Sequence, residues 1–107
     1  MIGEIGENEI IYIVGSISDD PHYKSKFRNA EERLRALGYK YIINPTCVAD
    51  NLPYTCYAPI SIGFVNACTV LYVLEGYEAS KGVCAEMSYA IMSGKKIVME
   101  EHYGSKD

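Results

Sequence analysis

The chain has 107 residues, of which 49% are apolar and 22% are charged, and its formal net charge is −4. A chain of this length forms one domain around a single hydrophobic core. The acidic balance argues against a nucleic acid polymer as partner, since phosphates attract basic surfaces. No apolar run in the sequence approaches the ~20 residues that span a bilayer. We therefore expect a soluble cytoplasmic protein with no membrane partner.

The four cysteines lack the spacing of a metal site or a disulfide framework. No two of them form a C-x-x-C motif, and none has a neighbouring histidine. They stand at Cys47, Cys56, Cys68 and Cys84. We expect free thiols in a reducing compartment and no bound metal.

Strand and helix patterns alternate along the chain. We expect a flexible leader over residues 1–8, a single domain over 9–100 and a polar tail over 101–107. Continuous apolar or β-branched runs predict strands, over residues 10–14, 39–43, 69–74 and 96–99. Apolar residues at helical spacing predict helices, over residues 21–37, 59–68 and 82–93. Asp20 is expected to cap the first helix and Gly38 to end it.

This order of elements predicts an α/β fold. Its strands pair in parallel through right-handed crossovers, which gives a three-layer flavodoxin-like or Rossmann-like sheet of about four strands. Ligands bind such sheets outside the carboxyl ends of the strands, where the strand order reverses. The loops over residues 15–20 and 75–82 are expected to meet there.

Both loops combine glycine, hydroxyl groups and the amino terminus of a helix. The first reads G-S-I-S-D-D, which matches neither the dinucleotide motif nor the P-loop, so no cofactor is predicted. It offers Gly15, Ser16 and Ser18, and the second loop offers Ser80 and Gly82. Serine and glycine are ordinary turn residues. Two such loops at one crevice nevertheless favour an anionic or polyhydroxylated ligand.

Glu86 is a carboxylate on a helix whose other inward positions are apolar. As a structural residue, an acid in the first helical turn is favoured by the helix dipole by ~0.3–1 kcal/mol. As a functional residue, the same dipole keeps the carboxylate ionised near the crevice, which suits a nucleophile. The residues alone leave both interpretations open.

Four motifs recur in an order known from one enzyme superfamily. They are I-Y-I-V-G-S-I at 11–17, N-P at 44–45, N-A-C-T-V-L-Y-V-L at 66–74 and S-K-G-V-C-A-E-M-S-Y-A-I-M-S-G-K-K-I at 80–97. Together they resemble the nucleoside 2-deoxyribosyltransferase superfamily. The chain is most similar to its small uncharacterised members and to the deoxynucleoside 5′-monophosphate N-glycosidases.

The resemblance implies roles for individual residues. The glutamate of G-x-x-x-E, here Glu86, is the nucleophile that attacks the anomeric carbon and forms a glycosyl-enzyme. Tyr12 resembles the residue that orients this glutamate. Gly15, Ser16 and Ser80 resemble the phosphate contacts of the branch that cleaves monophosphates. A 5′-phosphorylated substrate is therefore preferred, since transferases acting on nucleosides tend to carry aspartate at the position of Ser80.

Two positions depart from the superfamily pattern. Ser61 stands near the place of an aspartate that faces the sugar and base, and Thr69 replaces another that is common in small members. Without an acid at Ser61 the leaving base has no evident proton donor, and such general acid catalysis is worth ~10²–10⁴-fold. Asp50, Glu75 or Glu78 could donate this proton from the loops, and nothing in the sequence favours one of them.

Three functions follow as hypotheses. The first is an N-glycosidase or deoxyribosyltransferase acting on a nucleotide or nucleoside. The alternative, which the missing aspartate favours, is a non-catalytic module that binds or sequesters a nucleotide or a nucleotide-derived signal. A structural oligomer would suit the ten tyrosines but leaves the two loops unexplained. A homo-oligomer is expected in any case, because so small a sheet leaves apolar helix surface to cover and the superfamily is similar in sharing sites across subunits.

Overall fold

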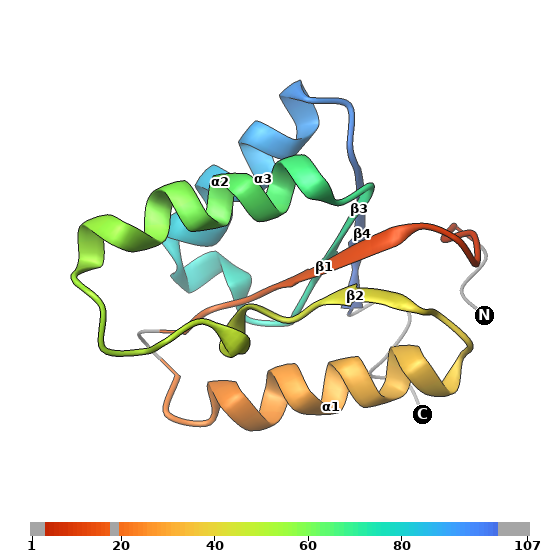
Figure 1. Cartoon of the computed structure of the whole chain (residues 1–107), viewed down its shortest axis with the longest axis horizontal. Coiled ribbons are helices and arrows are strands. Elements are labelled where there is room, and N and C mark those ends of the chain that lie inside the picture. The colour runs from red at the N-terminus through yellow and green to blue at the C-terminus, as the bar shows by residue number, and fades with distance from the viewer. Residues whose placement is uncertain (1–3, 18–19, 101–107) are drawn as a thin grey trace.

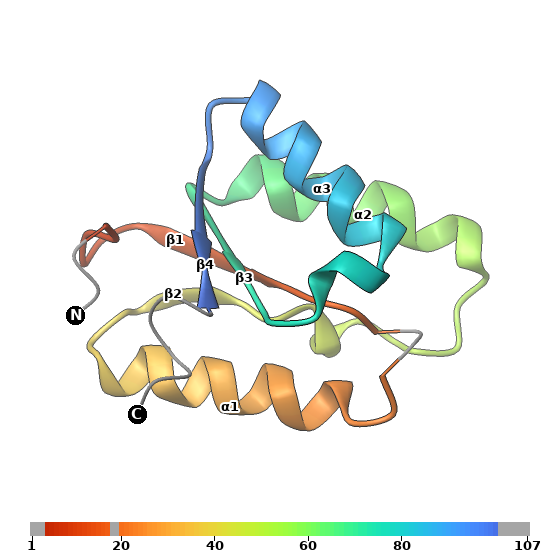
Figure 2. The ribbon, with the colours of Figure 1, turned by 180° about the vertical axis from the view of Figure 1, so that it is seen from behind.

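A computed structural model of the chain describes residues 4–17 and 20–100. Its sheet has four strands, paired in parallel in the order β2-β1-β3-β4, with bounds β1 (Ile10–Val14), β2 (Tyr41–Ile43), β3 (Val70–Val73) and β4 (Lys96–Met99). Helix α1 (Tyr23–Ala36) covers one face, and α2 (Tyr57–Ala67) and α3 (Lys81–Met92) cover the other (Figures 1 and 2). The predicted three-layer parallel α/β fold is thus confirmed.

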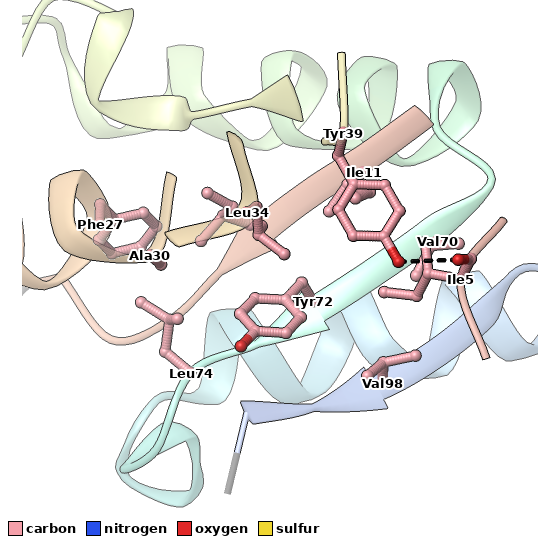
Figure 3. Packing of buried hydrophobic residues seen from close by; sticks show 11 residues of the cluster. Ile5, Ile11, Phe27, Ala30, Leu34, Tyr39, Val70, Tyr72, Leu74 and Val98 are labelled. Carbon is pink, nitrogen blue, oxygen red and sulfur yellow. Dashed lines mark hydrogen bonds between the residues drawn. The ribbon is translucent and has the colours of Figure 1, made fainter. Parts of the chain in front are cut away.

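The core consists of two layers, one on each face of the sheet. Because successive side chains of a strand point to opposite faces, Ile11 and Ile13 pack on the α1 side with Phe27 and Leu34. Figure 3 shows the α1-side layer, in which Tyr72 of β3 also lies. Tyr12 alternates with them and belongs to the layer beneath α2 and α3.

Helix α1 begins later than the sequence predicts. Asp20 does not cap it; its Oδ1 atom accepts a hydrogen bond of 2.8 Å from the His22 amide, within the turn that precedes the helix. Such a contact to the amide two residues on competes with helix formation at this point. The other end is as predicted, since Gly38 follows the helix with φ of 102°.

Helix α2 begins two residues before the predicted position, so that Pro59 falls in its first turn, where proline is tolerated. Three short 3₁₀ turns flank the helices, η1 (Pro45–Cys47), η2 (Tyr54–Cys56) and η3 (Tyr77–Ala79). Within residues 4–17 and 20–100, none of the helices has both the length and the apolar character needed to cross a bilayer.

Two residues of the expected leader contact the rest of the domain: the Glu4 carbonyl accepts a hydrogen bond of 3.3 Å from Lys96 Nζ, and Ile5 is buried. Ile5 is 1% exposed, and its carbonyl oxygen accepts a hydrogen bond of 2.7 Å from the hydroxyl of Tyr39 (Figure 3). Ile5 thus packs in the core, although it falls within the segment expected as a leader. An isoleucine side chain between acidic and glycine residues gave the only sequence signal for this contact.

Candidate functional site

The strand order reverses between β1 and β3, and the two predicted loops meet there. The chain runs from β1 outward to β2 and then returns to β3 on the other side of β1. The hydroxyl of Ser16, after β1, donates a hydrogen bond of 3.1 Å to the carbonyl oxygen of Gly76, after β3. This edge is where ligands bind parallel α/β sheets.

Gly15 permits the close approach of these two chain segments. A Cβ atom added to Gly15 would lie 3.1 Å from the Cβ of Leu74, which is tighter than ordinary contact. The Leu74 amide also donates a hydrogen bond of 2.9 Å to the carbonyl of Val14. Gly15 and Ser16 therefore have structural roles at the crevice. Ser18, the third predicted residue of this loop, lies outside the described residues.

Ser80 begins helix α3 at the same edge. Its hydroxyl oxygen accepts a hydrogen bond of 3.2 Å from the Val83 amide, which is the geometry of a helix N-cap. Gly82 is the second residue of the helix, and an added Cβ would meet Ser80 at 3.8 Å, an ordinary contact. Local packing thus explains the serine but does not require the glycine.

Glu86 faces Tyr12 across the layer between helix and sheet. Helix α3 begins at Lys81, so Glu86 is its sixth residue and the first turn holds no acid. The interpretation of Glu86 as a first-turn acid favoured by the dipole is therefore wrong. The hydroxyl of Tyr12 donates a hydrogen bond of 2.5 Å to Glu86 Oε2. Phe64 of α2 holds the tyrosine ring, with ring centroids 5.4 Å apart.

Burial is the main influence on the titration of this pair. It raises the pKa of the Glu86 carboxyl above its ordinary value of 4.5, while hydrogen bonds from Tyr12 and Ser61 lower it. Burial and the charge of Glu86 both raise the pKa of the Tyr12 hydroxyl. Loss of hydration therefore opposes the ionised form that the helix dipole was expected to favour.

Ser61 belongs to this network, and Thr69 does not. Ser61 lies half-buried on α2, and hydrogen bonding by its side chain lowers the pKa of both the Tyr12 hydroxyl and the Glu86 carboxyl. The Thr69 hydroxyl accepts a hydrogen bond of 2.9 Å from the Ile10 amide, at the amino ends of β1 and β3. Of the two departures noted in the sequence, only Ser61 changes the chemistry beside Glu86.

Sequence reasoning missed Phe64 as a member of the network. The residue lies three positions after Ser61 on α2, so both project from the same side of the helix. This spacing could have indicated that Phe64 lies near Ser61. An aromatic residue in an apolar helix is usually a core residue, however, so the sequence gave no reason to place Phe64 beside Tyr12.

The three loop acids that the sequence left unranked differ in their surroundings. Asp50 forms an ion pair of 3.1 Å with Lys24 of α1. Glu75 lines a cavity of about 190 Å³ on the α1 face, with Lys26, Asn29, Arg33 and Glu100. Glu78 is exposed in η3, next to Tyr77, which packs against the layer that holds Tyr12. Glu78 is therefore the loop acid on the Glu86 side of the sheet.

Lys26, Arg33 and Glu100, which line the cavity on the α1 face, form ion pairs within the protein. Arg33 pairs with Glu100, whose other carboxylate oxygen accepts a hydrogen bond of 3.1 Å from the Glu75 amide. Lys26 pairs with Asp20 at 2.5 Å. Within the described part of the chain, no group of three or more metal-ligating side chains gathers.

Fold and site define a small parallel α/β domain with a tyrosine–carboxylate pair between the sheet and helix α3. The chain belongs to the family described as Domain of unknown function (DUF4406), whose model matches residues 9–99. No curated protein and no solved structure gives a significant match to the chain.

Proposed function

We propose that the protein is an N-glycosidase or deoxyribosyltransferase of the nucleoside 2-deoxyribosyltransferase superfamily. It cleaves the N-glycosidic bond of a nucleotide through a covalent glycosyl ester on Glu86. The observation that carries the proposal is the 2.5 Å hydrogen bond from Tyr12 to Glu86, which joins two residues 74 positions apart. These are the two residues to which the sequence motifs assign the nucleophile and its orienting partner.

The geometry of the pair suits nucleophilic attack. Tyr12 donates to Oε2 of the carboxylate and so fixes the orientation of the group that attacks the anomeric carbon of the sugar. A fixed carboxylate reacts faster than a mobile one, because its orientation is established before the substrate binds. Water or a second base then attacks the same carbon and regenerates Glu86, with retention of configuration.

The crevice edge offers donors for a 5′-phosphate. The first amides of an α-helix have no acceptor within the helix, and those of α3 follow Ser80 directly. The Ser80 hydroxyl oxygen accepts from Val83, so its hydrogen is available for a phosphate oxygen. Ser16 donates to Gly76 and must rotate to do the same. Ser80 and Gly82 are thus the preferred phosphate contacts in this proposal.

The test is release of free base from a panel of deoxynucleoside 5′-monophosphates, followed by chromatography. We expect Glu86→Gln to abolish release and to leave binding of these nucleotides largely intact, measured as the rise in melting temperature. Glu32→Gln, on the exposed side of α1, makes the same chemical change elsewhere and should retain activity. Equal base release by the Glu86→Gln and unsubstituted proteins would remove Glu86 from the mechanism.

The second candidate is a module that binds a nucleotide without cleaving it. Ser61 favours this alternative, because the position beside Glu86 carries a hydroxyl where a proton donor is needed for many leaving bases. If nucleotides raise the melting temperature and no base appears with any of them, the binding function replaces the enzymatic one.

A further inference from the structure

Among the described residues, the side chains that hydrogen-bond to the Glu86 carboxylate all carry hydroxyl groups. Tyr12 and Ser61 are the side chains that hydrogen-bond to it. The five ion pairs among residues 4–17 and 20–100 all involve other acids. In the part of the chain that the structure describes, Glu86 is therefore a half-buried carboxylate with no ion pair and no second carboxyl hydrogen-bonded to it.

We propose that this site selects N-glycosides whose base carries a positive charge on the ring attached to the sugar. This inference rests on the proposed N-glycosidase function and names its substrate class. N7-alkylated purine nucleotides and N-glycosyl pyridinium nucleotides have this chemistry. Each departs from the sugar as a neutral molecule.

Cleavage of such a substrate needs no proton donor. An oxygen lone pair of Glu86 forms the bond to the anomeric carbon, and the electron pair of the breaking C–N bond neutralises the cationic ring. A negative carboxylate and a positive base thus give a neutral ester and a neutral leaving group. Water then attacks the anomeric carbon, loses one proton to solvent and restores the carboxylate. An uncharged purine would instead leave as an anion unless an acid protonated it.

The charge of the substrate also completes the site electrostatically. A half-buried carboxylate without a cation is costly to ionise, because burial removes hydration and no neighbouring charge replaces it. A cationic base next to Glu86 supplies that charge when it binds, and so favours the ionised nucleophile. An uncharged base leaves the carboxylate uncompensated.

The neighbouring groups do not provide the missing proton. The Tyr12 hydroxyl donates its hydrogen to Glu86 and therefore holds no other proton to give to a base. Asp50 forms an ion pair with Lys24 of α1, and Glu75 lines the cavity on the α1 face. Glu78 is the remaining loop acid, and it is exposed in η3 without an ion pair among the described residues.

A matched pair of substrates tests the selectivity. The probes are 2′-deoxyguanosine 5′-monophosphate and its N7-methyl derivative, which differ by one methyl group and the positive charge that it creates. After subtraction of release without protein, we expect the methylated nucleotide to lose its base at least ~100-fold faster, the lower range of general acid catalysis. Equal or faster release from the unmethylated nucleotide overturns the inference and leaves the proposed function standing. Release from neither of them, while another nucleotide of the panel loses its base, overturns the inference alone; release from no nucleotide overturns both.

Substitution of Ser61 tests the physical reason for the selectivity. Ser61→Asp places a second carboxyl beside Glu86, and two carboxyls sharing a site hold one proton between them. We expect this variant to release base from the unmethylated nucleotide ~100-fold faster than the parent does. The preference for the methylated nucleotide then becomes smaller. Ser61→Asn has the same shape without the acidic proton and should show no such gain. Equal gains in both variants would contradict the inference.

Glu78→Gln provides an independent test that leaves Ser61 unchanged. If this substitution abolishes release from the unmethylated nucleotide and spares the methylated one, Glu78 is the proton donor and the inference is overturned. We expect both rates to change less than twofold, because Glu78 is exposed in η3 and is not among the residues that hydrogen-bond to Glu86.

Discussion

At Glu86, burial and hydrogen bonding act on the same carboxyl group in opposite directions. Burial raises its pKa, and the hydroxyls of Tyr12 and Ser61 lower it by a smaller amount. An exposed helix position would avoid this conflict, so we expect the buried carboxyl to lower the free energy of unfolding once it is ionised. Destabilising arrangements of this kind concentrate at functional sites.

The raised pKa of Glu86 predicts a pH-dependent loss of stability. The folded protein holds the Glu86 proton more tightly than the unfolded chain, whose ordinary value is 4.5. Between 4.5 and the higher folded pKa, unfolding releases this proton, so the free energy of unfolding falls as pH rises through that window. Glu86→Gln has no proton to lose. Urea unfolding at several pH values should therefore show the variant gaining stability relative to the parent above pH 4.5.

The control for this comparison is Glu32→Gln, whose stability difference from the parent should show no such rise above pH 4.5, because Glu32 is exposed on α1. If the difference between the Glu86→Gln and unsubstituted proteins stays constant from pH 4 to 8, Glu86 is not a desolvated carboxyl.

Among the elements, α2 differs from α1 in the chemistry of its outer side. Seven of the 14 residues of α1 are charged, as befits a helix that faces water. Helix α2 reads Y-A-P-I-S-I-G-F-V-N-A and has no charged residue, although Val65 is its only buried one. Helix α3, beside it, exposes Ile91 at 64% and Met92 at 86%. A helix that is apolar on all sides is normally buried.

We expect the outer sides of α2 and α3 to form the contact between two copies of the chain. A two-fold interface places a surface against itself, and an uncharged surface does so without like-charge repulsion despite the net charge of −4. Ile62→Lys and Ile91→Lys place a lysine in this contact, and each should convert the oligomer to monomer in light-scattering chromatography. Glu32→Lys introduces the same side chain on α1 and should not. A monomeric mass for the unsubstituted protein would contradict the expectation.

For the molecule as a whole, the sequence predicts the fold better than the site. Strands β1 and β4 have the predicted bounds, because continuous β-branched runs are a strong signal for buried parallel strands. The sequence did not predict the contacts of Asp20 and Ile5, because a turn contact and a tertiary contact decided their positions. The convergence of Tyr12, Ser61 and Glu86 depends on how three elements pack, and periodicity alone does not determine that packing.

The most direct test of the central claim is detection of the sugar on Glu86. Intact protein mixed with a deoxynucleoside 5′-monophosphate and quenched within the first turnover should gain the mass of one sugar phosphate. Peptide mapping should locate it to Glu86, and Glu86→Gln should show no gain under the same conditions. Base release with the modification on another residue, or with no covalent adduct at any time point, would contradict the account.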